Sequence, residues 1–141
     1  MRLIKQQLKS FPHSGGFRHG WFYDEVYRAN FRVIFPCGDK ELTNENVNHY
    51  LKTQYSIDFM KDKADWNAMT LSIEGEGGPC AWVFAFRKAV PSIDEITHES
   101  VHAANRIYAS IGAEVDRIND EPYAYLVGSI ARRICLCLGR K

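Results

Sequence analysis

The N-terminal part of the chain carries short segments rich in β-branched and aromatic residues, separated by glycine and proline, which is typical of strands joined by turns. Residues 31–35 (FRVIF) predict a short buried strand. Residues 69–74 (MTLSIE) and 80–88 (CAWVFAFRK) predict two more, and the turn-rich residues 75–79 between them indicate a hairpin with a long turn. The glycines and aromatics of residues 14–22 (SGGFRHGWF) indicate a loop.

The segment 80–88 is apolar on both sides of the expected strand. Alternate positions carry large and small residues: Trp82, Phe84 and Phe86 on one face, and Ala81, Val83 and Ala85 on the other. A strand with two apolar faces is covered on both of them, so we expect helices or loops above and below this part of the sheet.

Helical periodicity begins at Thr43 and returns in the C-terminal part of the chain. Residues 43–55 place apolar side chains at core spacing after a capping threonine. Residues 93–110 predict a longer helix, because Ser92 and Glu95 form a capping box at its start and Gly112 is a stop signal at its end.

A polar connection, residues 112–120, leads to a last helix that is expected to begin near Glu121 and Pro122 and to continue to Gly139. Strands and one helix therefore come first, and two helices follow. This order predicts an α+β fold with a small antiparallel or mixed sheet.

The composition is that of an ordinary globular domain. The chain has 141 residues, of which 45% are hydrophobic and 25% charged, with a formal net charge of +1. We expect a single domain over residues 1–141, in which residues 1–79 have no assigned role. The near-neutral charge does not favour a nucleic-acid partner, and no apolar run is long enough to span a membrane. The four cysteines lack the spacing of a zinc knuckle or redox motif, which fits a reducing, cytoplasmic location.

The segment HESVH, residues 98–102, contains the most specific chemical signal. On a helix, residues four apart point in nearly the same direction and lie about 6 Å apart along the axis, so His98 and His102 can bind one metal ion. Glu99 is rotated by about 100° from His98, which places its carboxylate beside the metal. There it can take a proton from a water that the metal activates, as in the HExxH motif of zinc hydrolases.

The periodicity of the helix predicts that both histidines lie at the edge of its buried stripe, where a cleft can reach them. The expected apolar stripe consists of Ile96, Val101, Ala104, Ile107, Tyr108 and Ile111.

A catalytic zinc site needs a third protein ligand. Four acidic residues downstream are candidates: Glu114, Asp116, Asp120 and Glu121. The first two lie in the polar connection and reach the metal only if the loop folds back sharply. Glu121 is preferred, because it opens a helix that returns past the first one. The alternative role of Asp120 and Glu121 is helix capping and a favourable interaction with the helix dipole.

With a glutamate on the next helix, HESVH resembles the zincin metallopeptidases whose third ligand is glutamate, the gluzincins. Glu121 follows His102 by 19 positions, which is similar to the gap in thermolysin-like enzymes. The local sequence is more similar to small, mostly uncharacterised phage-encoded proteins assigned as metallopeptidases, in which a strand, a helix with HExxHA and a segment like E-x-Y-x-Y-L follow one another. The counterparts here are residues 81–88, 98–103 and 121–126.

The resemblance implies a minimal zincin-like domain in which His98, His102 and Glu121 bind Zn²⁺ and Glu99 is the general base. The implied activity is hydrolysis of an amide bond in a peptide or protein, with a protein of an infected bacterial host as one candidate substrate. The alternative is a phage-encoded binding or effector protein that keeps the zincin scaffold and contacts a host protein without proteolysis.

Peptide hydrolysis also profits from a hydrogen-bond donor that stabilises the oxyanion. Tyr108 and Tyr125 are candidates for this role or for substrate contact, beside Tyr123 and Arg106, and core packing is the alternative for the tyrosines.

Two further features leave alternatives open. The strand within residues 81–88 either presents an edge to which an extended peptide substrate adds, or lies in the interior of the sheet. His13 and His19 flank the glycine-rich segment and are either surface histidines or part of a second metal site, and their spacing favours the first interpretation.

Overall fold

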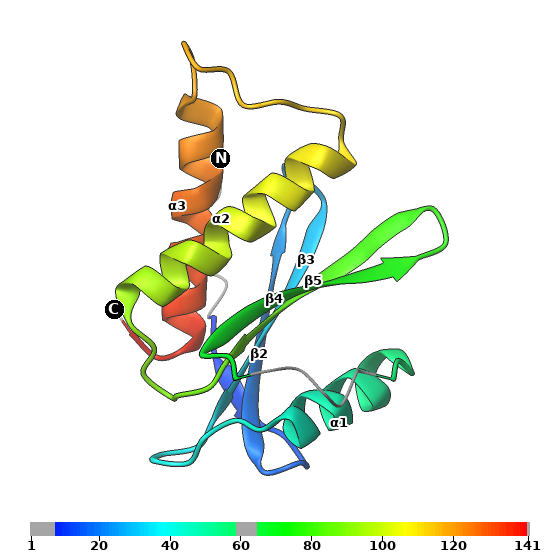
Figure 1. Ribbon diagram of the computed structural model, residues 1–141, viewed down its shortest axis with the longest axis vertical. Helices are drawn as coiled ribbons and strands as arrows, with labels where there is room; N and C mark the ends of the chain where they lie inside the picture. Colours follow the sequence, from blue (N-terminus) through cyan, green and yellow to red (C-terminus); the bar gives the residue numbers. More distant parts are fainter. Residues whose placement is uncertain (1–7, 59–64, 141) are drawn as a thin grey trace.

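The computed structural model describes residues 8–58 and 65–140, and within these ranges the chain forms a five-stranded sheet and three helices (Figure 1). The elements are β1 (Ser10–Pro12), β2 (Phe17–Asp24), β3 (Ala29–Pro36), α1 (Asn44–Tyr55), β4 (Ala68–Gly75), β5 (Gly78–Phe86), α2 (Ile93–Ser110) and α3 (Glu121–Cys137). The predicted α+β fold, in which a sheet is followed by two helices, is confirmed, and of the two predicted kinds of sheet, antiparallel or mixed, the structure has the mixed one. None of the helices in these ranges is long and apolar enough to cross a membrane.

The strands lie side by side in the order β1-β2-β3-β5-β4. All neighbours are antiparallel except β3 and β5, which run parallel. Strand β5 therefore lies in the interior of the sheet, which decides between the two interpretations of residues 81–88. The edge strand beside it is β4.

The helices cover both faces of the sheet, with α1 on one side and α2 and α3 on the other (Figure 1). The large residues of β5, Trp82, Phe84 and Phe86, belong to the core under α2 and α3, and the small ones, Ala81, Val83 and Ala85, belong to the core under α1. The predicted coverage of this strand on both faces is confirmed.

The prediction of a loop over residues 14–22 is wrong. The turn is confined to residues 13–16, where Gly16 adopts a φ of +85°, and β2 begins at Phe17. Gly20 lies within β2. A glycine is needed there because α3 approaches closely: a Cβ at this position would lie 3.1 Å from the Sγ atom of Cys137. A glycine needed for close packing and a glycine needed for a loop look alike in the sequence.

The turn between β4 and β5 is shorter than expected. The strands extend to Gly75 and from Gly78, which leaves the two residues Glu76 and Gly77 between them, and Gly77 has a φ of +89°. A bulge between Ile73 and Glu74 shifts the register shortly before the turn. Glycine-rich turns of two residues match the twist of antiparallel strands, so the hairpin is tight.

The helix boundaries agree closely with the sequence. Ser92 accepts a hydrogen bond from the backbone N–H of Glu95, and the Glu95 side chain accepts one from Ser92, which is the expected capping box of α2. Gly112 follows the end of α2 with a φ of +71°. Helix α3 begins at Glu121 and ends at Cys137, two positions before the expected glycine.

The packing of α3 on the sheet generates the first testable prediction. Ile130 is fully buried between α3 and the sheet. Replacing it by alanine leaves a cavity, so Ile130→Ala is expected to lower the free energy of unfolding by about 2–5 kcal/mol in urea titrations. Arg132→Ala, at an exposed position of the same helix, is the matched control, with an expected change of less than about 0.5 kcal/mol. Equal effects of the two substitutions would contradict this packing.

Candidate metal centre

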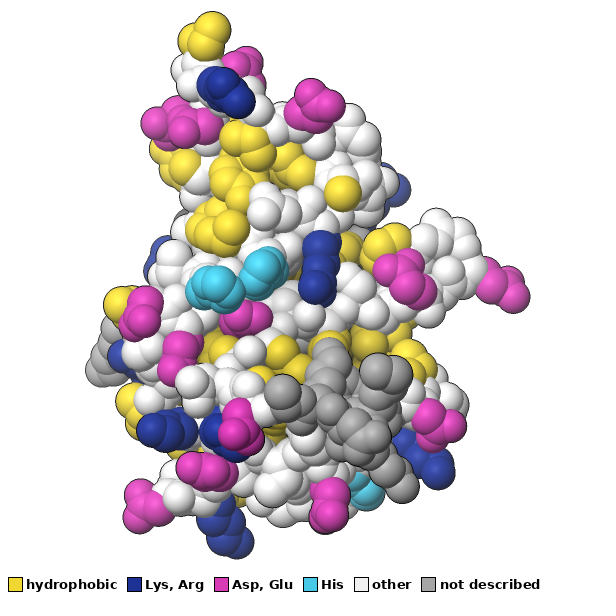
Figure 2. Space-filling model, in the orientation of Figure 1, with side chains coloured by type: hydrophobic (Ala, Val, Ile, Leu, Met, Phe, Trp, Pro, Cys, Tyr) yellow, Lys and Arg dark blue, Asp and Glu magenta, His cyan; other side chains and the backbone are white. Residues whose placement is uncertain are grey.

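Helix α2 buries one stripe of side chains and leaves the opposite stripe at the surface. The predicted core positions Ile96, Ala104, Ile107 and Tyr108 are buried, whereas Ile111 is 55% exposed. His98 and His102 are both exposed, and Figure 2 shows a pair of neighbouring histidines open on the face over α2. The prediction that both histidines lie outside the apolar stripe is confirmed.

The two imidazoles of this pair lie in direct contact. The Nε2 atoms of His98 and His102 are 3.0 Å apart, and the ring planes meet at 80°. Two imidazole nitrogens bound to one tetrahedral zinc ion at its usual bond lengths are about 3.3 Å apart. The separation therefore suits a shared metal ion as well as a hydrogen bond between the rings.

Glu99 lies on the flank of α2 that faces the edge strand β4. It is only 5% exposed, and its Oε1 atom accepts a hydrogen bond of 3.1 Å from the hydroxyl of Thr70. Its ligand atom and those of His98 and His102 lie within 4.8 Å of one another. The structure thus brings the three residues of the motif together, and they are the only such group of potential ligands within residues 8–58 and 65–140.

Thr70 was not foreseen as part of the site. Besides the bond to Glu99, its backbone carbonyl accepts a hydrogen bond of 2.7 Å from the Nη1 atom of Arg106. One residue of β4 therefore fixes α2 at two points that are two turns apart. The sequence signal was weak: Thr70 is a polar residue at a position of β4 that faces α2.

Glu121 is not part of this group. It is the exposed first residue of α3, and the contact that holds this end of α3 to α2 is a hydrogen bond of 2.6 Å from the Tyr123 hydroxyl to the Asn105 side chain. The remaining acidic candidates, Glu114, Asp116 and Asp120, are exposed as well. The Asp120 side chain makes no capping hydrogen bond, so the proposed capping role does not apply to it.

The two tyrosines proposed for the oxyanion have different environments. Tyr108 is buried in the core under α2 and α3 and packs edge-on against Tyr123, with ring centroids 5.3 Å apart, which is the packing role. Tyr125 is 75% exposed on α3. Burial raises the pKa of Tyr123, and the nearby Tyr108 raises it further.

His13 lies beside both His19 and His49, and the sequence did not indicate His49 as a partner. The ring of His13 lies 5.1 Å from that of His19 and 5.4 Å from that of His49 on α1, measured between centroids. The backbone N–H of Gly15 donates to the Nδ1 atom of His13. This histidine cluster packs on Phe17 and Tyr50 and is separate from the motif on α2.

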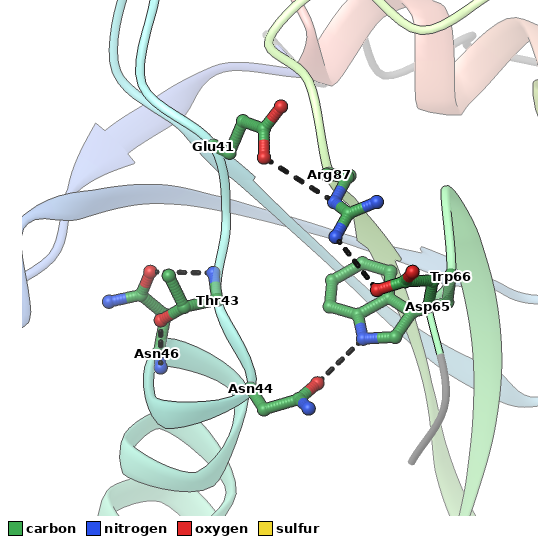
Figure 3. A network of polar contacts seen from close by, with 7 residues as sticks. All are labelled: Glu41, Thr43, Asn44, Asn46, Asp65, Trp66 and Arg87. Carbon is green, nitrogen blue, oxygen red and sulfur yellow. Dashed lines mark hydrogen bonds and ion pairs between the residues drawn. The ribbon is translucent and has the colours of Figure 1, made fainter.

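A second polar region lies where β5, α1 and β4 meet (Figure 3). Arg87 contacts Glu41 at 3.5 Å and Asp65 at 3.6 Å, and the Trp66 indole donates to the Asn44 side chain at 2.6 Å. The cavity among these residues has a volume of about 190 Å³. Its polar groups are paired with one another, so we interpret the region as a structural junction.

Neither protein-family models, nor curated proteins, nor solved structures match this chain. The chemistry of the site is therefore judged from its own geometry. Two imidazoles with converging nitrogens can hold a divalent transition metal, and a buried carboxylate beside them can accept a proton. This combination occurs on α2 alone within the described part of the chain.

The bond between Thr70 and Glu99 generates the second prediction. Thr70→Val removes the hydroxyl but keeps the shape, so the buried carboxylate of Glu99 loses its partner. We expect the free energy of unfolding to fall by about 1–3 kcal/mol in urea titrations, and Thr70→Ser to retain most of it. Ser72→Ala, on the same face of β4, is the control. A Thr70→Val protein as stable as the Thr70→Ser protein would show that the hydroxyl contributes nothing.

The histidine cluster generates a prediction about pH. Burial lowers the pKa of His13 and that of His19; His49 lowers the first further, and His13 and Arg32 lower the second. The unfolded chain therefore binds more protons than the folded one, and stability is lost as the pH falls below about 6.5 towards the lowered pKa values.

We expect His19→Gln to lose less stability than the parent protein between about pH 7.5 and pH 5.5, measured by chemical unfolding. His98 and His102 are present in both proteins, so their contribution cancels. The same pH dependence in both proteins would rule out the cluster as its source.

Proposed function

We propose that this chain is a zinc-dependent peptidase with a minimal zincin-like fold, in which α2 carries the active site. The observation that supports it most directly is the group formed by His98, Glu99 and His102, whose potential ligand atoms lie within 4.8 Å of one another. The order of the motif, its position on a capped helix and the edge strand beside it are those expected for the HExxH pattern.

His98 and His102 would hold the metal, since their Nε2 atoms are 3.0 Å apart and exposed to solvent. Zinc bound there would supply a Lewis acid for the substrate carbonyl and would lower the pKa of water. The exposed position of the rings leaves room for water and substrate on the same side.

Glu99 would be the general base. Its carboxylate is buried beside the histidines, and the Thr70 hydroxyl holds one oxygen at 3.1 Å. One hydrogen bond fixes the orientation of the carboxylate and leaves the second oxygen to accept a proton from the attacking water and to return it to the leaving amine. A carboxylate free to rotate would do this less efficiently.

Glu121 stays the preferred candidate for the third ligand. In favour of it are its exposed carboxylate and its location at the start of α3, two residues before the contact between Tyr123 and Asn105. Asn105 itself lies about one turn beyond His102 on α2. Glu121 has to move towards the histidines to bind the same ion, because it lies outside their group.

The substrate we propose is an extended peptide. Strand β4 has β5 on one side, and within the described residues no strand covers its other side. A peptide that adds to this edge would pass close to Glu99, because Thr70 of β4 contacts the Glu99 carboxylate. Main-chain hydrogen bonds would give affinity, and the carbonyl of the substrate would come close to α2.

One observation favours the alternative, a binding or effector protein that contacts a host protein without proteolysis. The group on α2 contains two histidines and no carboxylate from α3 or from the connection before it. Two protein ligands hold zinc more weakly than three, so a site of this kind is compatible with a scaffold that no longer cleaves.

Zinc analysis of the purified protein tests the proposal. We expect one zinc per chain, lost in His98→Ala and retained in Glu99→Gln, because only the first substitution removes a ligand. Cleavage of a peptide library, followed by mass spectrometry, is expected to fall at least about 100-fold in Glu99→Gln, since a general base contributes this much or more.

The other outcomes are distinct. No zinc in protein purified without chelator removes the metallopeptidase proposal. Zinc without cleavage favours the binding protein. A zinc affinity that falls in Glu121→Ala and not in Glu114→Ala assigns the third ligand to Glu121.

A further inference from the structure

A groove with a volume of about 550 Å³ lies beside the C-terminal half of α2 and includes Thr70, which contacts Glu99. It lies between the edge strand and the C-terminal half of the helix and is lined by Thr70, Leu71, Ser72, Glu74, Pro79, Arg106, Ala109 and Ser110. Figure 2 shows a basic side chain beside the histidine pair on this face. The size of the groove suits one or two substrate side chains.

The groove is connected to the catalytic group through a single residue. Thr70 lines the groove, its hydroxyl contacts Glu99 at 3.1 Å, and its carbonyl contacts Arg106 at 2.7 Å. The Arg106 guanidinium and the proposed general base, Glu99, therefore contact the same residue of β4. A substrate residue bound next to the scissile bond would lie within reach of the guanidinium.

Arg106 brings a positive charge that no described acidic side chain neutralises. The ion pairs of the described residues involve Arg87 and Arg133. Among the same residues, Arg106 makes a single hydrogen bond, to a backbone carbonyl. A guanidinium has five N–H donors arranged as a fork, so several remain free to bind a carboxylate in bidentate fashion.

The opposite charge in the groove lies further away. Glu74 is four residues along β4 from Thr70, which corresponds to about 13 Å in an extended strand. A carboxylate in the groove is attracted by Arg106, and it is repelled by Glu74 along β4 and by Glu99 on the other side of Thr70. The charges thus favour a bound carboxylate at Arg106.

We propose that Arg106 makes this groove selective for substrates that carry a carboxylate within one or two residues of the scissile amide bond. The carboxylate is either an acidic side chain or the C-terminal carboxylate of the peptide; both offer the same planar group to the guanidinium. The inference rests on the proposed peptidase function only in treating the bound peptide as a substrate. The binding preference itself can be measured without cleavage.

Peptide binding to the Glu99→Gln protein, with zinc added, tests the preference without turnover. Three kinds of probe are compared by NMR titration: a tetra-alanine peptide blocked at both ends, the same peptide with one glutamate at each position in turn, and tetra-alanine with a free C-terminal carboxylate. At least one acidic probe is expected to bind about tenfold or more tightly than the neutral one, since a charged hydrogen-bonded pair contributes this much. The second and third probes distinguish a side chain from a chain terminus.

The role of Arg106 is tested by Arg106→Gln in the same background, with Arg132→Gln, the same change of charge at an exposed position of α3 outside the groove, as the matched control. We expect the preference to fall below about twofold in the first variant and to persist in the second. If Arg106→Gln fails to fold, the Nε–H resonance of Arg106 in the parent protein replaces it: acidic probes are expected to shift this resonance and the neutral probe is not.

Equal binding of acidic and neutral probes, or a preference that survives Arg106→Gln, overturns the inference. Its failure differs from failure of the proposed function. A preference without any cleavage by the native protein supports the groove and removes the peptidase. Cleavage without a preference keeps the peptidase and removes the role of Arg106.

Discussion

Burial of one stripe of α2 against the sheet determines where every functional side chain of this helix lies. Ile96 and Ile107 anchor the helix in the core, so the opposite side with His98 and His102 reaches solvent. The two flanks then have different neighbours. One flank, with Glu99 and Arg106, faces β4, and the other, with Asn105, meets α3. The candidate site is thus a consequence of how one amphipathic helix lies across one sheet.

Thr70 gives this arrangement its precision. A carboxylate as buried as that of Glu99 loses much of its hydration, and a hydrogen-bond partner offsets part of that loss. The partner comes from the edge strand, so the helix cannot rotate or slide along β4 without breaking this bond. The bond from Arg106 to the carbonyl of the same residue adds a second fixed point. The Glu99 carboxylate and the Arg106 side chain are therefore both held to the same residue of β4.

The features that the sequence predicted are those set by local order. The capping box of α2, its exposed histidines and the two apolar faces of β5 follow from residues close together in the chain. Contacts set by the pairing of distant elements were missed, such as the meeting of Thr70 with Glu99 and of His49 with His13. The location of Glu121 relative to the histidines likewise depends on the path of the connection before α3, which the sequence does not determine. The role of Gly20 was also missed, because it depends on packing against α3, which is distant in the chain.

The sheet consists of two antiparallel units, β1–β2–β3 and β4–β5, which meet at the single parallel pairing of β3 with β5 (Figure 1). Phe31 and Trp82 pair at this junction although α1 and β4 lie between them in the chain. Closing such a long loop costs chain entropy before the strands gain their contacts. The core that seats α2 contains residues from both units. Both histidines lie on α2, so a cation that binds the pair would favour the helix that this core seats and would shift the folding equilibrium towards the folded state.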